Sequence, residues 1–163
     1  MNATSTFHRP RYEHRQTGWA MLALACVPAV CLGVILMMAP EARRTAPTPL
    51  LIGLGVVMAV VVIGFTSLSV MVTPDHLVVR FGIGLFRKSV ALADIVGVEV
   101  TRTRWYEGWG IHWTRRGTLY NVAGFDAVRI RLANGKAMLV GSDDAQRLAA
   151  AIRRATDDRR AAR

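Results

Sequence analysis

The stretch Gly18–Ala39, GWAMLALACVPAVCLGVILMMA, contains no charged residue, and neither does Leu50–Val72, LLIGLGVVMAVVVIGFTSLSVMV. At about 1.5 Å per residue, a helix over the first stretch is roughly 33 Å long, enough to cross a hydrocarbon core of about 30 Å. The sequence therefore predicts two transmembrane helices. Because residues 67–73 alternate polar and apolar side chains with strand period, the second helix is expected to end near Phe65, or at Val72 on the alternative boundary.

The segment between the two apolar stretches, residues 40–49, contains three prolines and turns the chain back, so the two helices are expected to form an antiparallel hairpin. Lys and Arg are more frequent beside the outer ends of the two apolar stretches than in the connection between them. By the positive-inside rule, this distribution predicts a multi-pass protein of the cell membrane with both termini in the cytoplasm. Small residues repeat every four positions and predict close helix packing, within the hairpin or between two chains, although small residues are also simply common in such helices. These candidate packing residues are Ala25, Ala29, Gly33, Gly55 and Ala59.

The predicted organisation has four parts. Residues 1–17 form a cytoplasmic tail, residues 18–66 form the hairpin with spans at 18–39 and 50–66, residues 67–156 form one small domain, and residues 157–163 form a disordered charged tail. The net charge of +10 is attributed to arginines beside the bilayer segments, so no nucleic-acid partner is predicted.

The domain after the apolar stretches has the pattern of an α+β fold. Two strand-like runs joined by a glycine turn predict strands near 76–82 and 86–92, and period-two alternation predicts a further strand near 95–103 and a hairpin over Asp126–Val140. Asn134-Gly135 is expected to supply the two positive φ angles of a tight primed turn. A final helix should begin near Asp143, which has capping-box spacing to Gln146, and bury a stripe of Leu148, Ala149 and Ile152.

Four phrases of this domain resemble the bacterial pleckstrin-homology-like (PH-like) domain of membrane-anchored proteins. They are Gly84–Lys88, Gly108–Ile111, Gly117–Gly124 and Gly141–Asp144, and the similarity covers about residues 67–156. The resemblance implies a partly open antiparallel β-barrel of two nearly orthogonal sheets capped by one C-terminal helix. The turn at residues 73–76 lacks the basic pair of phosphoinositide-binding relatives, so inositol-lipid recognition is not carried over.

Aromatic and basic residues concentrate between positions 102 and 116 and form the candidate partner or lipid surface. Three roles remain open: aromatics packed on the end of the barrel, docking of a protein partner, and contact with anionic lipid. The candidate residues are Arg102, Arg104, Trp105, Tyr106, Trp109, Trp113, Arg115 and Arg116.

No nucleophile in the sequence has a visible base, and Cys26 and Cys31 face different sides of one helix. The sequence therefore predicts no enzyme, no catalytic residue, no cofactor and no metal. The predicted function is a membrane-anchored binding or scaffold protein whose cytoplasmic PH-like domain engages a protein partner or a second copy of itself. The alternatives are an anionic-lipid-contacting module using residues 102–116, and an accessory subunit of a membrane enzyme or transporter.

Overall fold

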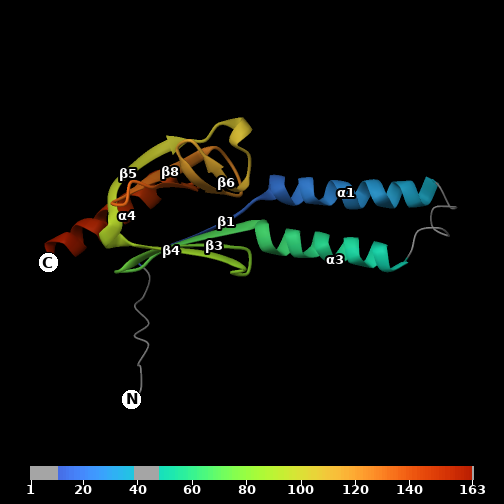
Figure 1. Ribbon diagram of the computed structural model, residues 1–163, viewed down its shortest axis with the longest axis horizontal. Coiled ribbons are helices and arrows are strands. Elements are labelled where there is room, and N and C mark those ends of the chain that lie inside the picture. The colour runs from blue at the N-terminus through green and yellow to red at the C-terminus, as the bar shows by residue number, and fades with distance from the viewer. Residues whose placement is uncertain (1–10, 39–47, 163) are drawn as a thin grey trace, which may run out of the picture.

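The computed structural model describes residues 11–38 and 48–162. Within them the chain forms two β-sheets, two helices that project together from one end, and a third helix at the other end (Figure 1). The elements before the second sheet are β1 (Tyr12–Thr17), α1 (Trp19–Met38), α3 (Thr48–Phe65), β2 (Ser67–Val72), β3 (His76–Phe81), β4 (Phe86–Ala91) and the short 3₁₀ helix η1 (Leu92–Asp94). Those that follow are β5 (Ile95–Arg102), the 3₁₀ helix η2 (Trp105–Glu107), β6 (Gly110–Thr114), β7 (Gly117–Asn121), β8 (Asp126–Leu132), β9 (Ala137–Gly141) and α4 (Ala145–Ala161).

The first sheet is antiparallel with strand order β1-β2-β3-β4. Thr17, the last residue of β1, lies opposite Ser67, the first residue of β2. The helices α1 and α3 are therefore an arm inserted between two paired strands. The sequence placed residues 12–17 in a tail, because this edge strand lacks apolar alternation and buries only Gln16, whose Nε2 donates to the Gly141 carbonyl at 3.0 Å.

The arm joins the sheet through a contact that only glycine allows. The Gly18 amide donates to the Thr66 carbonyl at 2.7 Å, which closes the base of the arm. A Cβ at position 18 would lie 2.3 Å from the Val122 carbonyl oxygen, well inside contact distance. Gly18 therefore allows the base of the arm to pack against the segment that follows β7.

The second sheet has strand order β5-β8-β9-β7-β6. Its strands pair antiparallel except for β7 and β9, which run parallel with Thr118 opposite Met138. The sheet is mixed, so the predicted all-antiparallel barrel is wrong at this point. The reason is the insertion of the β8–β9 hairpin between β5 and β7, which places β9 beside β7 in the same direction.

The β8–β9 hairpin is present, but its turn differs from the predicted primed type. Gly135 has a φ of +78°, whereas no non-glycine residue in the described part of the chain, Asn134 included, has a positive φ. The Gly135 amide donates to the Leu132 carbonyl at 3.0 Å, and the Leu132 amide donates to the Lys136 carbonyl at 2.9 Å. This is a three-residue loop closed by a glycine bulge, and the Asn134 side chain supports it by accepting the Lys136 amide at 3.0 Å.

The core lies between the two sheets and under α4. The predicted stripe of Leu148, Ala149 and Ile152 is buried there, beside fully buried residues of both sheets such as Leu77 and Ile130. Burial of this apolar surface is the main favourable term for folding. The two sheets therefore enclose a shared core that α4 covers at one end.

The helix α4 begins and ends later than the sequence indicates. Its N-cap is Asp144, whose side chain accepts the Arg147 amide at 3.2 Å, because Asp143 instead contacts His14. At the other end α4 continues to Ala161, five residues beyond the predicted boundary. Ion pairs from Asp158 and Arg159 to segments far away in the sequence hold this last part in place.

The predicted transmembrane hairpin is corrected by the structure. No helix in residues 11–38 or 48–162 is both long enough and apolar enough to cross a membrane. The helix α3 has 18 residues and is about 27 Å long, because the chain enters β2 at Ser67. This finding contradicts the two spans, the multi-pass location in the cell membrane with both termini in the cytoplasm, and the membrane anchor of the predicted function.

The arm formed by α1 and α3 carries large apolar side chains that stay exposed. The two helices lie side by side (Figure 1), but a Cβ added at Gly33 or Gly55 would meet no described atom within 4 Å. The predicted close approach at these glycines is therefore not seen in the described residues, Ala29 and Ala59 are exposed, and the side chain of Ala25 lies outside them. The exposed apolar residues of the arm include Val27, Val30, Val34, Ile35, Ile52, Val56, Val57, Val60 and Ile63.

Candidate functional site

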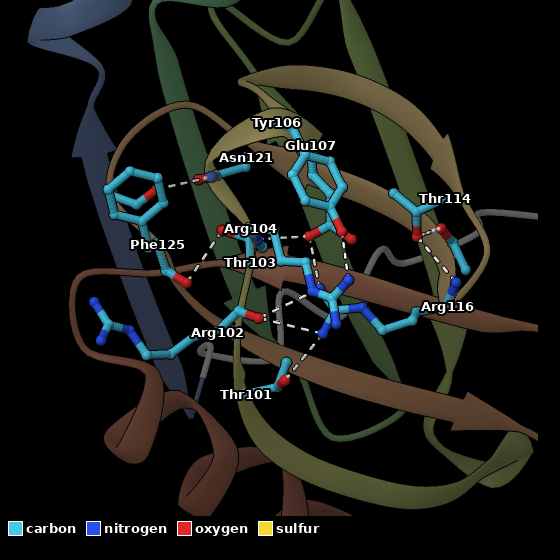
Figure 2. A network of polar contacts seen from close by, with 12 residues as sticks. Thr101, Arg102, Thr103, Arg104, Tyr106, Glu107, Thr114, Arg116, Asn121 and Phe125 are labelled. Carbon is cyan, nitrogen blue, oxygen red and sulfur yellow. Dashed lines mark hydrogen bonds and ion pairs between the residues drawn. The ribbon is translucent and has the colours of Figure 1, made fainter.

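Residues 102–116, called the aromatic loop below, connect β5 to β7 through η2 and β6. Thr103 fixes the beginning of the loop, since its amide and its hydroxyl both donate to the Phe125 carbonyl, at 2.6 and 3.1 Å. The turn of η2 is closed twice: the Glu107 amide donates to the Arg104 carbonyl at 2.9 Å, and the Arg104 amide donates to Glu107 Oε2 at 2.8 Å. The start of the loop is therefore tied to a fixed conformation (Figure 2).

Arg116 holds the two ends of the aromatic loop together. Its guanidinium donates to Glu107 Oε2 at 2.6 Å, to the Arg102 carbonyl at 3.2 and 3.3 Å, and to Thr101 Oγ1 at 3.4 Å. Figure 2 shows this guanidinium at the centre of the network. The Arg116 side chain is 31% exposed and the Glu107 side chain only 9%, so the ion pair is partly shielded from water. It is the structural anchor of the loop.

This network favours the charged form of Glu107. Burial alone raises the pKa of its carboxyl group, but the hydrogen bonds from the Arg104 amide and the Arg116 guanidinium, with the positive charge of Arg116, outweigh burial. The pKa of Glu107 therefore lies below its ordinary value. The carboxylate and the guanidinium stabilise each other in the folded state.

Three aromatic side chains project from this anchored framework into solvent. Trp105 is 80% exposed, Tyr106 60% and Trp113 93%. The Arg104 guanidinium carbon lies 5.7 Å from the centre of the Tyr106 ring. Arg104 Nη1 donates to the Tyr106 hydroxyl, and the Trp105 ring meets the Tyr106 ring edge to face. Of the three roles left open by the sequence, packing of these aromatics on the end of the barrel does not fit such exposure.

The remaining predicted site residues divide between structure and surface. Arg102 pairs with Asp126 at 3.3 Å on the rim, and Arg115 is exposed beside Trp113. Trp109 is half-buried, and its carbonyl is hydrogen-bonded to His112 Nε2 at 2.5 Å. The structure therefore brings Arg104, Trp105, Tyr106, Trp113 and Arg115 to the outside of the loop, and assigns Arg116 to its interior.

Three hollows of the described residues border Trp113, and the two larger ones are considered below. One, of about 730 Å³, lies within the aromatic loop and is lined by Arg104, Tyr106, His112, Arg115 and Arg116. The other, of about 830 Å³, runs between β4 and β6, the last strands of the two sheets, over Phe86, Ile111 and Tyr120. Burial raises the pKa of the Tyr120 hydroxyl. Trp113 thus stands between a depression lined by three arginines and a depression with a mixed apolar and polar lining.

Glu107 and Tyr120 were not singled out from the sequence. Glu107 carried a usable signal, because it is the one acid in a segment with four arginines and hence their natural partner. Tyr120 carried none, because the groove beside it depends on the distance between two sheets. In the described residues no cluster of three or more His, Cys, Asp or Glu side chains has the spacing of a metal site.

Comparison with known proteins identifies no relative. No protein-family model, no curated protein and no solved structure matches the chain. The resemblance to a PH-like domain therefore stays an expectation drawn from the four phrases quoted above.

Proposed function

We propose that this protein is a binding module that engages a protein partner through the outer side chains of the aromatic loop. The observation that carries the proposal is the exposure of Trp105, Tyr106 and Trp113 on a segment held rigid by the Arg116–Glu107 pair. Side chains of this size in water represent a large apolar area that association can bury.

The composition of the surface favours a protein as the partner. Trp, Tyr and Arg are the residue types most enriched where binding energy concentrates in protein interfaces. A rigid loop also loses little conformational entropy on association, which leaves more of the contact energy for affinity. The neighbouring hollow of about 730 Å³ offers a place for one side chain of the partner beside Arg104 and Arg115.

The test compares full-length variants for partner capture in cells that make the protein natively. Trp113→Ala is expected to reduce the recovery of one specific partner by at least about tenfold, the effect of losing a central interface aromatic. Trp19→Ala is the matched control, because Trp19 is 72% exposed and lies in α1, outside the loop. Trp19→Ala should recover as much of the partner as the wild type does.

Self-association is measured on the same variants by sedimentation velocity, since a second copy of the chain is one admissible partner. A dimer that Trp113→Ala dissociates supports the proposal with the chain as its own partner. Equal recovery and equal sedimentation for all three proteins contradict it. Binding to vesicles of anionic phospholipid that Trp113→Ala abolishes, with no protein partner recovered, assigns the loop to lipid contact instead.

A further inference from the structure

The outer face of the first sheet carries a row of arginines that runs across its four strands. Adjacent strands place these residues directly opposite one another: Arg15 opposite Ser69, Ser69 opposite Arg80, and Arg80 opposite Arg87. Opposite residues share one face of a sheet. Since Leu68 and Val70, the neighbours of Ser69, are buried in the core, the row faces away from it.

The charge of this row is not neutralised by an ion pair within residues 11–38 and 48–162. In the described residues none of the three arginines forms an ion pair, and the one hydrogen bond from a guanidinium of the row joins Arg15 Nη2 to Ser67 Oγ at 3.5 Å. The Arg80 Nε atom is enclosed and has no hydrogen-bond partner there. The only acid in strands β1 to β4 is Glu13, which lies on the same face opposite Met71, one pair away from the row.

The second sheet differs in having an acid among its arginines, although Arg129 Nε there is enclosed without a hydrogen-bond partner in the described residues, as Arg80 Nε is. There Arg129 lies directly opposite Glu99, and Arg131 forms an ion pair with Glu99 at 3.3 Å. Opposite charges across two strands stabilise a sheet, whereas like charges such as Arg80 and Arg87 destabilise it. The first sheet thus keeps an unfavourable arrangement that an anion would make favourable.

The geometry of the row selects the kind of anion. Guanidinium groups bind phosphate oxygens through paired hydrogen bonds, and the hydroxyl of Ser69 between two arginines adds a further donor. Three strand spacings of about 4.8 Å separate β1 from β4, so the row is roughly 14 Å long. A single small anion reaches only part of it, while a chain of linked phosphate groups can contact all three arginines.

We propose that the row of Arg15, Arg80 and Arg87 is a binding site for a soluble oligophosphate, that is, a compound with two or more linked phosphate groups. The site lies on the first sheet, apart from the aromatic loop, and does not depend on the function proposed for that loop.

The test is titration calorimetry of the full-length protein with tripolyphosphate, pyrophosphate and phosphate at low ionic strength. Affinity should rise with the number of phosphate groups and fall when salt is added. Arg87→Ser, an exposed edge-strand change, should weaken tripolyphosphate binding at least about tenfold, the effect of one charge-assisted contact. Arg154→Ala is the matched control, since Arg154 is an exposed arginine on α4, and it should bind like the wild type.

Thermal unfolding supplies a second readout, because Arg87→Ser should raise the unfolding temperature without ligand but reduce the stabilisation that the ligand gives. Without ligand, Arg87→Ser should unfold at a higher temperature than the wild type, because one of two opposed like charges is gone. With the same concentration of tripolyphosphate, Arg87→Ser should gain less stability than the wild type, because it binds the ligand more weakly. Arg80→Lys keeps the charge but loses the planar fork, and should weaken binding while remaining folded.

Two results overturn the proposal. One is tripolyphosphate binding of equal strength in the wild type, Arg87→Ser and Arg80→Lys. The other is binding to vesicles of anionic phospholipid that depends on Arg87 while tripolyphosphate neither binds nor competes, which would assign the row to a lipid headgroup.

Discussion

Replacing Arg116 by alanine removes the side chain that ties the two ends of the aromatic loop together. The change deletes the hydrogen bond to Glu107 at 2.6 Å and the two contacts to the Arg102 carbonyl at 3.2 and 3.3 Å. Glu107 keeps the Arg104 amide as a partner but loses its opposite charge in a position that is only 9% exposed. The loop should become both less stable and less ordered.

The expected size follows from these contacts. A hydrogen bond to a charged group contributes about 1.5–3 kcal/mol, and an ordinary one about 1 kcal/mol. Because the Arg116 side chain is 31% exposed, we take the lower value for the charged contact. The free energy of unfolding should fall by about 2–3 kcal/mol, which lowers the melting temperature by roughly 4–12 °C in a chain of this size.

The assay is a double-mutant cycle on chemical unfolding with Arg116→Ala, Glu107→Gln and the combined variant. We expect a coupling free energy of about 1–2 kcal/mol between the two positions. Amide hydrogen exchange at positions 104 and 107 should accelerate in Arg116→Ala, while exchange in β8 follows only the global stability.

Additive effects of the two single changes would refute this reasoning, because they would mean that Arg116 and Glu107 act independently. Unchanged exchange at positions 104 and 107 in Arg116→Ala would show that the loop is ordered by other contacts.

Three further predictions test the pH dependence, the arm and the cap of α4. Because the pKa of Glu107 is lowered in the folded state, its carboxylate contributes full stability above its ordinary value of about 4.5 and loses it as the pH falls through the folded value, so the stabilities of wild type and Glu107→Gln should converge in acid. Gly18→Ala should destabilise by about 1–3 kcal/mol because the new methyl group meets the backbone after β7. Gly53→Ala, which has open space in α3, should instead stabilise by about 0.5–1 kcal/mol in thermal unfolding. Asp144→Ala should lower the unfolding free energy by about 1 kcal/mol through loss of the N-cap, whereas Asp157→Ala in the same helix should change it by less than about 0.5 kcal/mol.

Much of the strand pattern was legible in the sequence. The runs predicted as strands at 76–82 and 95–103 coincide with β3 and β5, because strand propensity is encoded by adjacent residues, although neither strand alternates strictly between buried and exposed side chains. The site was legible as a cluster of residue types, since aromatics and arginines gather between positions 102 and 116. The sequence did not show that Arg116 lies inside the loop and Trp113 outside it, because burial depends on which distant backbone groups a side chain reaches.

The membrane prediction shows the limit of reading composition alone. The two apolar stretches were interpreted as membrane spans from their composition, whereas the end of the second helix at Phe65 and the strand from Ser67 lie where the alternation of residues 67–73 placed them. Ser67–Val72 belongs to a sheet because β2 pairs with β1 and β3. The strand β1 precedes β2 by the whole helical arm, whereas β3 follows β2 directly in the chain.

The sequence by itself determined the local elements: the alternating strands, the β8–β9 hairpin, the apolar stripe of α4 and the aromatic loop. Only the tertiary structure decided which strands meet, and hence that Arg15, separated from Arg80 and Arg87 by the whole helical arm, lies in one row with them. The physical reason is that periodicity is a property of neighbouring residues, while strand pairing and register are chosen by the burial and hydrogen bonding of the whole chain.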